Sequence, residues 1–536
     1  MIISIASALP KEMRFGALAL SRNSWSGPLI SVLLLLSATA MVIPLGAAHA
    51  SPTCGDVLGV STTLFSDINC AGSGLTIGEN GVTLNCAGHV INGSNGVSSV
   101  GILVANHKGV KVKNCVVTNF WVGISVKGGS KNTLFANLVS RSSVAGIALN
   151  SSFSDTVSGN ILNRDGTGVL LVSTNKTNIR NNAAIVSSPG DGFSLLDSNN
   201  NVLRSNSASG SLSGGAGFTL VASARNILIG NAASGDKAGF VISGNSFSNA
   251  FLGNTASGNA NSGFAFLLSS QKNRIISNTA TGNTEGFRIQ DSDKNLVRTN
   301  TASGNSPGDG FAFQTAKLSV IRGNIATSNG HDGFSLSGSS SNILWGNSAS
   351  SNSHSGFSVY ELFPASVKSN SNSLSRNIAS SNGHEGFSVS QSDRNVLSFD
   401  IARSNGNGFM FYMCNLTTLS SSSAIGNGNG VMLIHSNLTI VSRNTAGFSS
   451  GTGFSLSSSI SNSIVTNLAV GNIGDGFALA SDAYGNFMSQ NSANSNGAYG
   501  YRDLTTGFGT MGTANTHTGE VCAANAGGPS NPSGLC

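Results

Sequence analysis

Three histidines occupy the same position in a repeated sequence pattern. His331, His354 and His384 each stand three residues before a phenylalanine that follows glycine, and the chain has only 8 histidines in total. Imidazole groups that lie side by side can donate or accept protons near neutral pH. They can instead ligate a divalent ion, since histidine suits zinc or copper. The spacing therefore predicts one local site, either catalytic or metal-binding.

Acidic side chains occupy the next position of the pattern. In successive units that position holds Glu285, Asp309, Asp332, Ser355 and Glu385. Asp332 and Glu385 stand directly beside histidines, so we assign them, together with the three imidazoles, as candidate catalytic groups. The alternative is that both positions form a solvated turn before glycine, where Asp, Ser and His are all acceptable.

Aromatic and basic residues of the same region could bind a sugar chain. Trp345 takes an outward position in "NILWGN", and Tyr360 begins the insertion "YELFPASVKSNSN", which we expect to form a protruding loop. Their rings offer flat apolar faces for sugars. Arg298 and Arg322 share an outward position in adjacent units and could hold the carboxylates of an acidic glycan. We predict these four residues as substrate-binding, with solvated strand arginines as the alternative for the last two.

The elements that must position these residues are short strands. Gly-Phe pairs recur at intervals of mostly 22–25 residues, with one interval of 30 between Phe357 and Phe387. After each phenylalanine comes a small residue and then an apolar one, as in Phe334-Ser335-Leu336, which is the period of a strand with one buried face. A second strand reads Asn-x-apolar-x-x-Asn-x-Ala. No helical segment separates them, so each unit must be one coil of a solenoid whose coils pair in parallel.

Asparagine recurs at one position of the second strand. Stacked about 4.8 Å apart, the side-chain amides can bond each other and satisfy the carbonyl groups of turns. We interpret the column as a structural ladder, with Asp400 as a substitute in one coil. Its asparagines are Asn206, Asn231, Asn254, Asn278, Asn300, Asn324, Asn347, Asn377, Asn444, Asn467 and Asn491.

The composition favours one repetitive domain over several compact ones. A chain of 536 residues would ordinarily form several domains. Here 68 glycines accompany 39% hydrophobic and only 9% charged residues, so apolar side chains must be buried between neighbouring repeats. The formal net charge of +6 is distributed without any Lys/Arg-rich run, which argues against nucleic-acid binding.

These repeats resemble the right-handed parallel β-helix repeats of the pectate-lyase-like superfold. The asparagine ladder and the Gly-Phe-x-apolar strands are most similar to repeats of mannuronan C5-epimerases and of the periplasmic nitrous-oxide-reductase maturation protein, over roughly residues 54–505. The resemblance implies an all-β, single-stranded right-handed parallel β-helix of about 22–25-residue coils with an N-terminal cap. It does not imply one activity, because the superfold contains lyases, hydrolases, epimerases and plain binding proteins.

The first 50 residues are typical of a signal peptide. Lys11, Arg14 and Arg22 precede an apolar run that ends in "AAHA", an Ala-x-Ala cleavage pattern. A retained membrane anchor is the alternative, and no later stretch is apolar enough to span a bilayer. We expect a signal peptide at 1–50, an N-terminal cap at 51–80, the β-helix at 81–505 and a C-terminal tail or cap at 506–536.

Most cysteines lie near the two ends of the mature chain. Both ends of a solenoid expose apolar cross-section, so disulfides there would staple the caps, and such bonds suit a secreted or periplasmic protein. Cys414 stands apart, and we expect it to be a buried small hydrophobe. The expected disulfide cysteines, whose pairing stays open, are Cys54, Cys70, Cys86, Cys115, Cys522 and Cys536.

Three functions remain open from the sequence. The first is a secreted protein that binds or processes an extended polysaccharide or cell-surface glycan, as a lyase, epimerase or hydrolase if it is an enzyme. No catalytic motif of those classes is intact, since Asp-Pro-His is missing and carboxylates are scattered. The second is a non-enzymatic structural or adhesive surface protein. The third is a periplasmic copper- or zinc-handling protein that uses His331, His354 and His384. No other cofactor is indicated.

Overall fold

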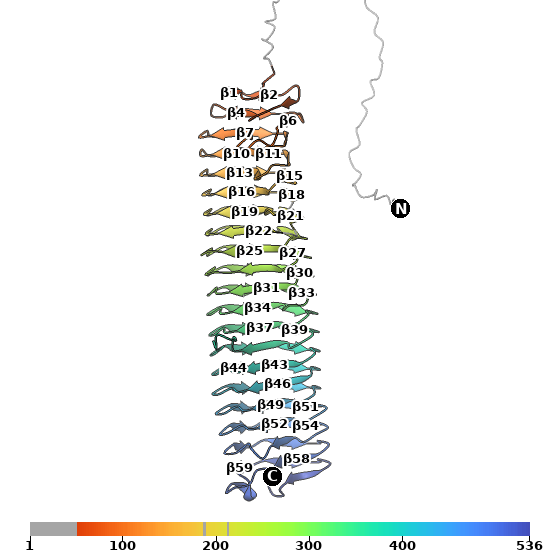
Figure 1. The fold of residues 1–536 in the computed structure, drawn as a ribbon. Coiled ribbons are helices and arrows are strands. Elements are labelled where there is room, and N and C mark those ends of the chain that lie inside the picture. Colours follow the sequence, from red (N-terminus) through yellow and green to blue (C-terminus); the bar gives the residue numbers. More distant parts are fainter. Residues whose placement is uncertain (1–50, 186–188, 212–213) are drawn as a thin grey trace, which may run out of the picture. The chain divides into compact units, whose positions relative to one another are not determined.

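The computed structural model describes residues 51–185, 189–211 and 214–536. The predicted signal peptide lies outside these residues. Residues 51–536 wind into a single stack of coils, each made of short strands that run across the stack (Figure 1). Within the described ranges there is one 3-10 turn, η1 (Thr510–Gly512), and no helix long and apolar enough to cross a membrane.

Each coil contributes one strand to each of three parallel sheets. A typical coil consists of β34 (Phe311–Gln314), β35 (Val320–Arg322) and β36 (Ile325–Thr327), and the chain then returns in β37 (Phe334–Ser337) to pair with β34 in parallel. We name the sheets A, B and C in that order. This arrangement confirms the predicted all-β parallel solenoid. The sheets begin at β1 (Val57–Leu58), β2 (Thr62–Thr63) and β3 (Ile68–Asn69), and end at β61 (Gly528–Asn531), β59 (Thr516–Thr518) and β60 (Val521–Ala523).

Sheet A and sheet B carry the side chains discussed below. The relevant strands of sheet A, besides β34 and β37, are β22 (Ala216–Val221), β25 (Ala238–Ser243), β28 (Ser262–Phe266), β31 (Glu285–Gln290), β40 (Phe357–Tyr360), β43 (Glu385–Ser390) and β46 (Asn407–Tyr412). Those of sheet B, besides β35, are β29 (Arg274–Ile276), β32 (Leu296–Arg298) and β38 (Ile343–Trp345).

In most coils the core combines aromatic, aliphatic and small side chains from the three sheets. The phenylalanines of sheet A stack coil upon coil, and Phe311 lies 4.7 Å from Phe287 and 4.8 Å from Phe334 between ring centroids. Aliphatic side chains such as Ile321 fill the core from sheet B, and small alanines such as Ala326 fill it from sheet C, all fully buried. The period-two pattern of the sequence thus places one residue of each strand of sheets B and C inside, and two of a sheet A strand such as β34, Phe311 and Phe313.

Asparagine ladders close all three corners of the coil. At the corner between sheets B and C, Asn324 donates to the Val297 carbonyl (2.9 Å) and to Asn347 Oδ1 (3.0 Å), and its own Oδ1 accepts from the Asn300 backbone (2.9 Å). This is the predicted ladder. The other two corners hold equivalent ladders, represented by Asn342 and Asn329, which were not predicted from the sequence.

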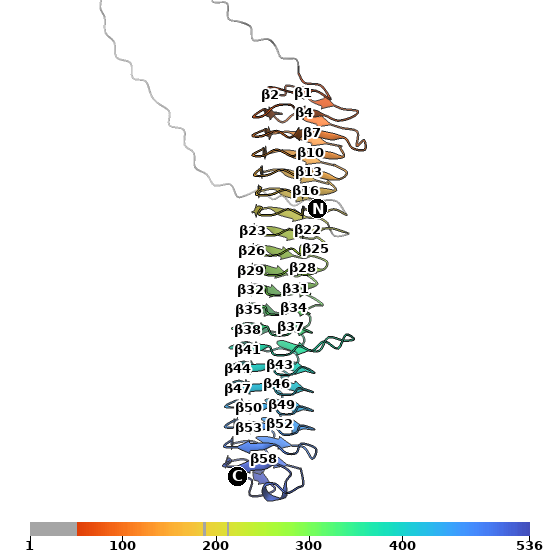
Figure 2. The same ribbon diagram turned by 90° about the vertical axis from the view of Figure 1, so that its left-hand side faces the viewer.

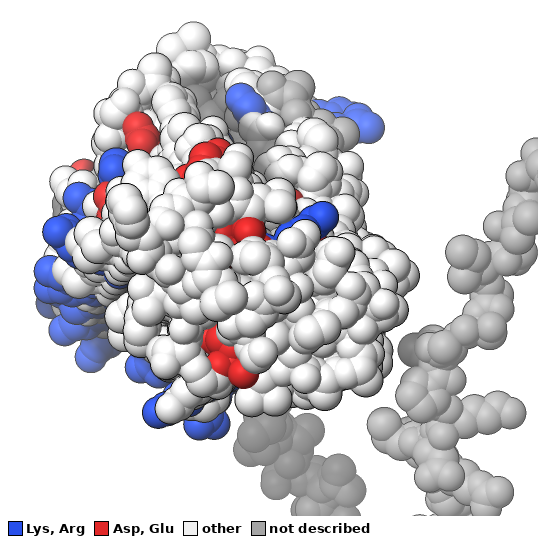
Figure 3. All heavy atoms as spheres, turned by 90° about the horizontal axis from the view of Figure 1, so that it is seen from below, with Lys and Arg blue, Asp and Glu red and all other residues white. Residues whose placement is uncertain are grey.

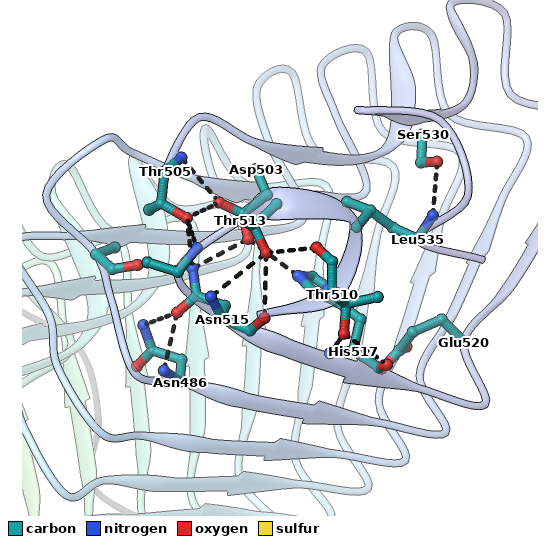
Figure 4. A network of polar contacts seen from close by, with 12 residues as sticks. Asn486, Asp503, Thr505, Thr510, Thr513, Asn515, His517, Glu520, Ser530 and Leu535 are labelled. Carbon is teal, nitrogen blue, oxygen red and sulfur yellow. Dashed lines mark hydrogen bonds and ion pairs between the residues drawn. The ribbon is translucent and has the colours of Figure 1, made fainter. Parts of the chain in front are cut away.

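The ends of the stack are fastened covalently and by buried polar contacts. Disulfides join Cys54 to Cys70, Cys86 to Cys115 and Cys522 to Cys536, which supplies the pairing that the sequence left open. The buried Cys414 is free, as expected. At the C-terminal end, the buried His517 and Asn515 both bond the Asp503 carboxylate at 3.0 Å, under the loop that carries η1 (Figure 4).

The insertion after Tyr360 forms a hairpin that projects from sheet A (Figure 2). Leu362 and Val367 exchange backbone hydrogen bonds across it, and Ser369 Oγ donates to the Tyr360 carbonyl at 2.7 Å to close its base. The hairpin packs on Gly338, whose φ is 58° and where a Cβ would lie only 3.1 Å from the side chain of Leu362. Glycine thus allows the close approach of the hairpin to this turn.

Candidate functional site

The three predicted histidines form a column on the outer surface before sheet A. The rings of His331 and His354 are parallel within 6°, with centroids 4.6 Å apart, and those of His354 and His384 lie 4.2 Å apart with a tilt of 33°. The first two side chains are 48% and 40% exposed, so each ring keeps one edge open to solvent. The repeat therefore brings together residues that are 23 and 30 positions apart.

Carboxylates of the preceding coil fix the first two rings. Asp309 Oδ1 accepts hydrogen bonds from His331 Nδ1 (2.7 Å) and from the backbone of Asp332 (2.9 Å). One coil further, Asp332 Oδ1 repeats both contacts with His354 Nδ1 (2.7 Å) and the backbone of Ser355 (2.9 Å). Because Nδ1 is engaged in both rings, Nε2 is the nitrogen left for a ligand.

The third histidine lacks such an acceptor. The position that would hold its carboxylate is occupied by Ser355, whose hydroxyl instead donates to Glu385 Oε2 at 3.1 Å. This break in the acidic column explains why the His384 ring tilts while its two neighbours stay parallel. Glu385 itself is almost fully buried and also accepts from Asn407 Nδ2 at 3.3 Å.

His331 is positively charged at neutral pH. The hydrogen bond to Asp309 raises the pKa of His331 to about 9, against a smaller opposing effect of burial. The bond to Asp332 likewise raises the pKa of His354. Since the folded pKa of His331 exceeds its unfolded value, the pair with Asp309 contributes its full stability below about pH 6.5, and loses it as the pH rises through about 9.

Replacing Asp309 tests this assignment. In Asp309→Asn we expect the pKa of His331 to fall from about 9 towards the ordinary value near 6.5, because the acceptor loses its charge. Titration of the imidazole signals by NMR would measure it. Asp191→Asn is the matched control, since Asp191 bonds the next coil's backbone at the same position without facing a histidine. An unchanged His331 pKa in Asp309→Asn would contradict the assignment.

A row of adjoining hollows forms a groove along sheet A beside the histidine column. Four adjoining hollows follow one another from β22 to β46, and each shares side chains with the next: Val241 joins the first two, Glu285 the second and third, and Tyr360 the third and fourth. At about 4.8 Å per coil the groove is roughly 40 Å long. His331, His354, His384, Asp332 and Glu385 all line its last hollow.

Tyr360 and the hairpin form a wall of the groove. The Tyr360 hydroxyl bonds Ser335 Oγ at 3.1 Å, and Phe363 at the hairpin is 64% exposed towards the same hollows. Small hydroxyl side chains such as Ser358 and Ser388 lie between this wall and the histidines. Tyr360 thus lies in the same hollow as the histidines, and its role as a flat contact for sugars stays a prediction.

Glu285 is a groove residue that was not among the predicted site residues. Burial raises its pKa to about 7, although Arg288 and a 3.0 Å hydrogen bond from Ser262 Oγ act in the opposite direction. A carboxyl group with that pKa can donate or accept a proton near neutral pH. Glu285 occupies the same repeat position as Asp332. The column of acidic residues at that position could therefore have identified Glu285 as a site residue from the sequence.

Three predicted substrate-binding residues lie elsewhere. Arg298, Arg322 and Trp345 occupy register-matched outward positions of sheet B, while the histidines and Tyr360 belong to sheet A and the turn before it. The Arg322 guanidinium lies 4.2 Å above the Trp345 ring. The residues that we expected to form one site therefore lie on two different faces of the solenoid, sheet A and sheet B.

The histidine column has suitable donors for a metal but is not arranged for one ion. Donor atoms of His331, Asp332 and His354 lie within 4.8 Å of one another, and imidazole with carboxylate suits zinc or copper. Two nitrogens on one such ion are at most about 4.2 Å apart, because each bond is about 2.0–2.1 Å long. Parallel rings 4.6 Å apart would have to tilt, and His331 would have to lose its proton.

Fold and groove together define a right-handed parallel β-helix protein with a surface cleft along one sheet. The chain belongs to the family described as periplasmic copper-binding protein (NosD), whose model matches residues 60–185, 254–371 and 364–505. A model described as right handed beta helix region also matches residues 146–289. No curated protein matches the chain.

Several solved structures are similar in fold. DFA-IIIase from Arthrobacter chlorophenolicus A6 is 11% identical, with 51% of this chain and 84% of that chain covered and a TM-score of 0.36. The A-module of the Azotobacter vinelandii mannuronan C-5 epimerase AlgE4 is 12% identical, with 72% and 88% covered and a TM-score of 0.31. A variant of the periplasmic alginate epimerase AlgG is 14% identical, with 58% and 74% covered and a TM-score of 0.25. Similarity at this level says nothing about a substrate.

Proposed function

We propose that this chain is an exported protein that binds an extended polysaccharide in the groove of sheet A. The observation that carries the proposal is the row of four adjoining hollows from β22 to β46, which suits a linear ligand better than a compact one. The three disulfides support an oxidising compartment outside the cytoplasm.

The chemistry of the lining supports a sugar chain. Carboxylates such as Asp309 and Glu285 accept hydrogen bonds from hydroxyl groups, and serine side chains between them can both donate and accept. Tyr360 and Phe363 offer ring faces for the apolar side of a sugar. The imidazolium of His331 adds a cation, so the same groove could also hold a carboxylate of an acidic glycan.

A polysaccharide screen with two matched variants tests the proposal. Alginate, pectin and neutral glycans would be tested for binding by calorimetry and for cleavage or unsaturated products. Tyr360→Ser should weaken binding about 3–10-fold, since an aromatic contact contributes about 0.5–1.5 kcal/mol. Serine is tolerated there because the register neighbours are Ser337 and Ser390. Trp345→Ser on sheet B, next to Ser375, is the control and should bind normally.

Two outcomes would contradict the proposal. One is the absence of binding to every glycan, which would favour a structural or adhesive role. The other is an equal loss of glycan affinity in Tyr360→Ser and Trp345→Ser, which would show that the glycan does not bind specifically in the groove of sheet A. Release of shortened or unsaturated chains would support the proposal and would make the protein an enzyme, with Glu285 and the histidine column as the groups to test first.

Metal binding at the histidine column is a second candidate function. It is favoured by the donor set of His331, Asp332 and His354 and by the description of the family as copper-binding. The fourth hollow also contains Met410, whose thioether suits Cu(I). The buried Cys414, whose pKa burial raises to about 12, is not available as a thiolate ligand.

Retained metal distinguishes this candidate. Copper or zinc that copurifies with the protein, and that a His331→Asn/His354→Asn variant loses, would support metal binding. Because the proton on His331 competes with the metal, we expect the affinity to rise with pH up to about 9. A pH-independent affinity, or retention of metal by the double variant, would contradict a site at this column.

A further inference from the structure

Basic side chains gather on one side of the solenoid. The clearest group lies on three adjacent coils of sheet B and their preceding turns, and we call it the basic face: Lys272, Arg274, Lys294, Arg298, Lys317 and Arg322. All six are exposed. Seen along the stack, Lys and Arg side chains lie above one another along one side of the molecule (Figure 3). No basic run exists in the sequence, because these residues form three pairs that the coil length places 22–24 positions apart.

The positive charge of the basic face is largely uncompensated. Within residues 51–185, 189–211 and 214–536, none of its six side chains forms an ion pair. The same turns carry two carboxylates, Asp291 and Asp293, of which Asp293 accepts the backbone N–H of Lys317 at 2.8 Å. The face therefore keeps an excess of cations that the fold does not use.

Exposed apolar side chains adjoin the basic face. Leu318 is 54% exposed, Val320 36%, Ile343 48% and Trp345 37%. Val320 and Ile343 are register neighbours at one edge of the strands, and Trp345 follows Arg322 at the other. The buried side chains between them, such as Ile321, hold both edges on a rigid sheet.

We infer that the basic face and its apolar neighbours dock the protein on the surface of an anionic lipid bilayer. Lysine and arginine attract acidic headgroups, and each contributes about 1 kcal/mol near such a surface. Tryptophan prefers the level of the headgroups, where Arg322 beneath its ring can meet phosphate while the indole contacts acyl chains. Sheet B then lies on the membrane, and the groove of sheet A stays open to solvent on another face.

The exposed apolar side chains favour a membrane over a soluble polyanion as the ligand of the basic face. A dissolved acidic polymer would use the positive charges and at most the Trp345 ring, and it would leave Leu318, Val320 and Ile343 in water. A bilayer offers anionic headgroups over an apolar layer, so it satisfies both kinds of side chain on this face. The inference is independent of the glycan proposal, because the two sites share no residue.

Sedimentation of the full chain with lipid vesicles tests the inference. We expect binding to phosphatidylglycerol vesicles, little binding to phosphatidylcholine, and loss in 1 M salt, where the screening length is about 3 Å. Arg298→Gln/Arg322→Gln should weaken binding about 25-fold, at about fivefold per side chain. The control Arg141→Gln/Arg403→Gln changes the net charge equally but alters two exposed arginines away from sheet B, and it should bind normally.

The apolar contribution is tested with the same two serine variants. Trp345→Ser should weaken binding to phosphatidylglycerol vesicles, whereas Tyr360→Ser should not, which is the reverse of the glycan screen. Equal binding to neutral vesicles, an unaffected Arg298→Gln/Arg322→Gln variant, or a normal Trp345→Ser would overturn the inference. So would binding of soluble polygalacturonate that depends on the basic face and competes fully with vesicles.

Discussion

Asn324→Ala is expected to destabilise its part of the solenoid by about 2–6 kcal/mol. The substitution leaves the Val297 carbonyl and the Asn300 N–H without partners in the interior, and each buried group without a partner costs about 1–3 kcal/mol. Asn347 Oδ1 keeps the hydrogen bond from the backbone N–H of residue 324 at 3.0 Å. The loss falls on a fully buried ladder where water cannot replace the amide.

Amide hydrogen exchange of the coils around residues 300–347 would measure this loss, because local opening is more informative than one global transition in a long repeat array. Asn178→Ala is the matched control. Asn178 is an exposed asparagine on sheet B whose side chain makes no hydrogen bond within the described part of the chain, so we expect a change below about 0.5 kcal/mol. Similar effects of the two substitutions would contradict the structural role of the ladder.

Asp400→Asn is expected to stabilise the protein at pH 8 by about 2–4 kcal/mol and to have little effect at pH 4. Burial raises the pKa of Asp400 to about 7, although its hydrogen bonds from Asn377 and Ser398 oppose the shift. Because the folded pKa lies above the unfolded value near 4, stability falls as the pH rises from about 4 to about 7. Asparagine removes this penalty and restores the ladder residue.

Thermal unfolding at pH 4, 6 and 8 would show this dependence as a difference that grows with pH. Asp482→Asn is the control, since the hydrogen bonds from Ser458 lower the pKa of the exposed Asp482 and its replacement should give no gain at pH 8. A constant difference between Asp400→Asn and the parent protein at all three pH values would contradict the assigned ionisation.

The fold was predictable because each coil repeats the same physical constraint. Phe311, Ile321 and Ala326 recur with the coil length, and a buried position tolerates few residue types, so the core and one asparagine ladder are visible in the sequence. The two other ladders were missed because Asn329 and Asn342 lie among abundant Ser and Asn, where a column of asparagines does not stand out.

The site was predictable only in part. The column of His331, His354 and His384 followed from the repeat, but their carboxylate partners come from the preceding coil, and only the register shows that Asp309 faces His331. Trp345 was grouped with Tyr360 because the residues are close in the sequence, although they belong to different sheets. The alternation of apolar and polar residues along a strand shows that a side chain points outward, but it does not show which of the three sheets the strand belongs to.

The most direct test of the account is a crystal structure of the protein with an oligosaccharide that the screen identifies. We predict that the sugar chain lies along sheet A between β22 and β46, with rings against Tyr360 and Phe363 and hydroxyl or carboxylate groups at Glu285, Asp309 and His331. A ligand bound on sheet B or at either end of the stack, with the groove of sheet A empty, would contradict the account.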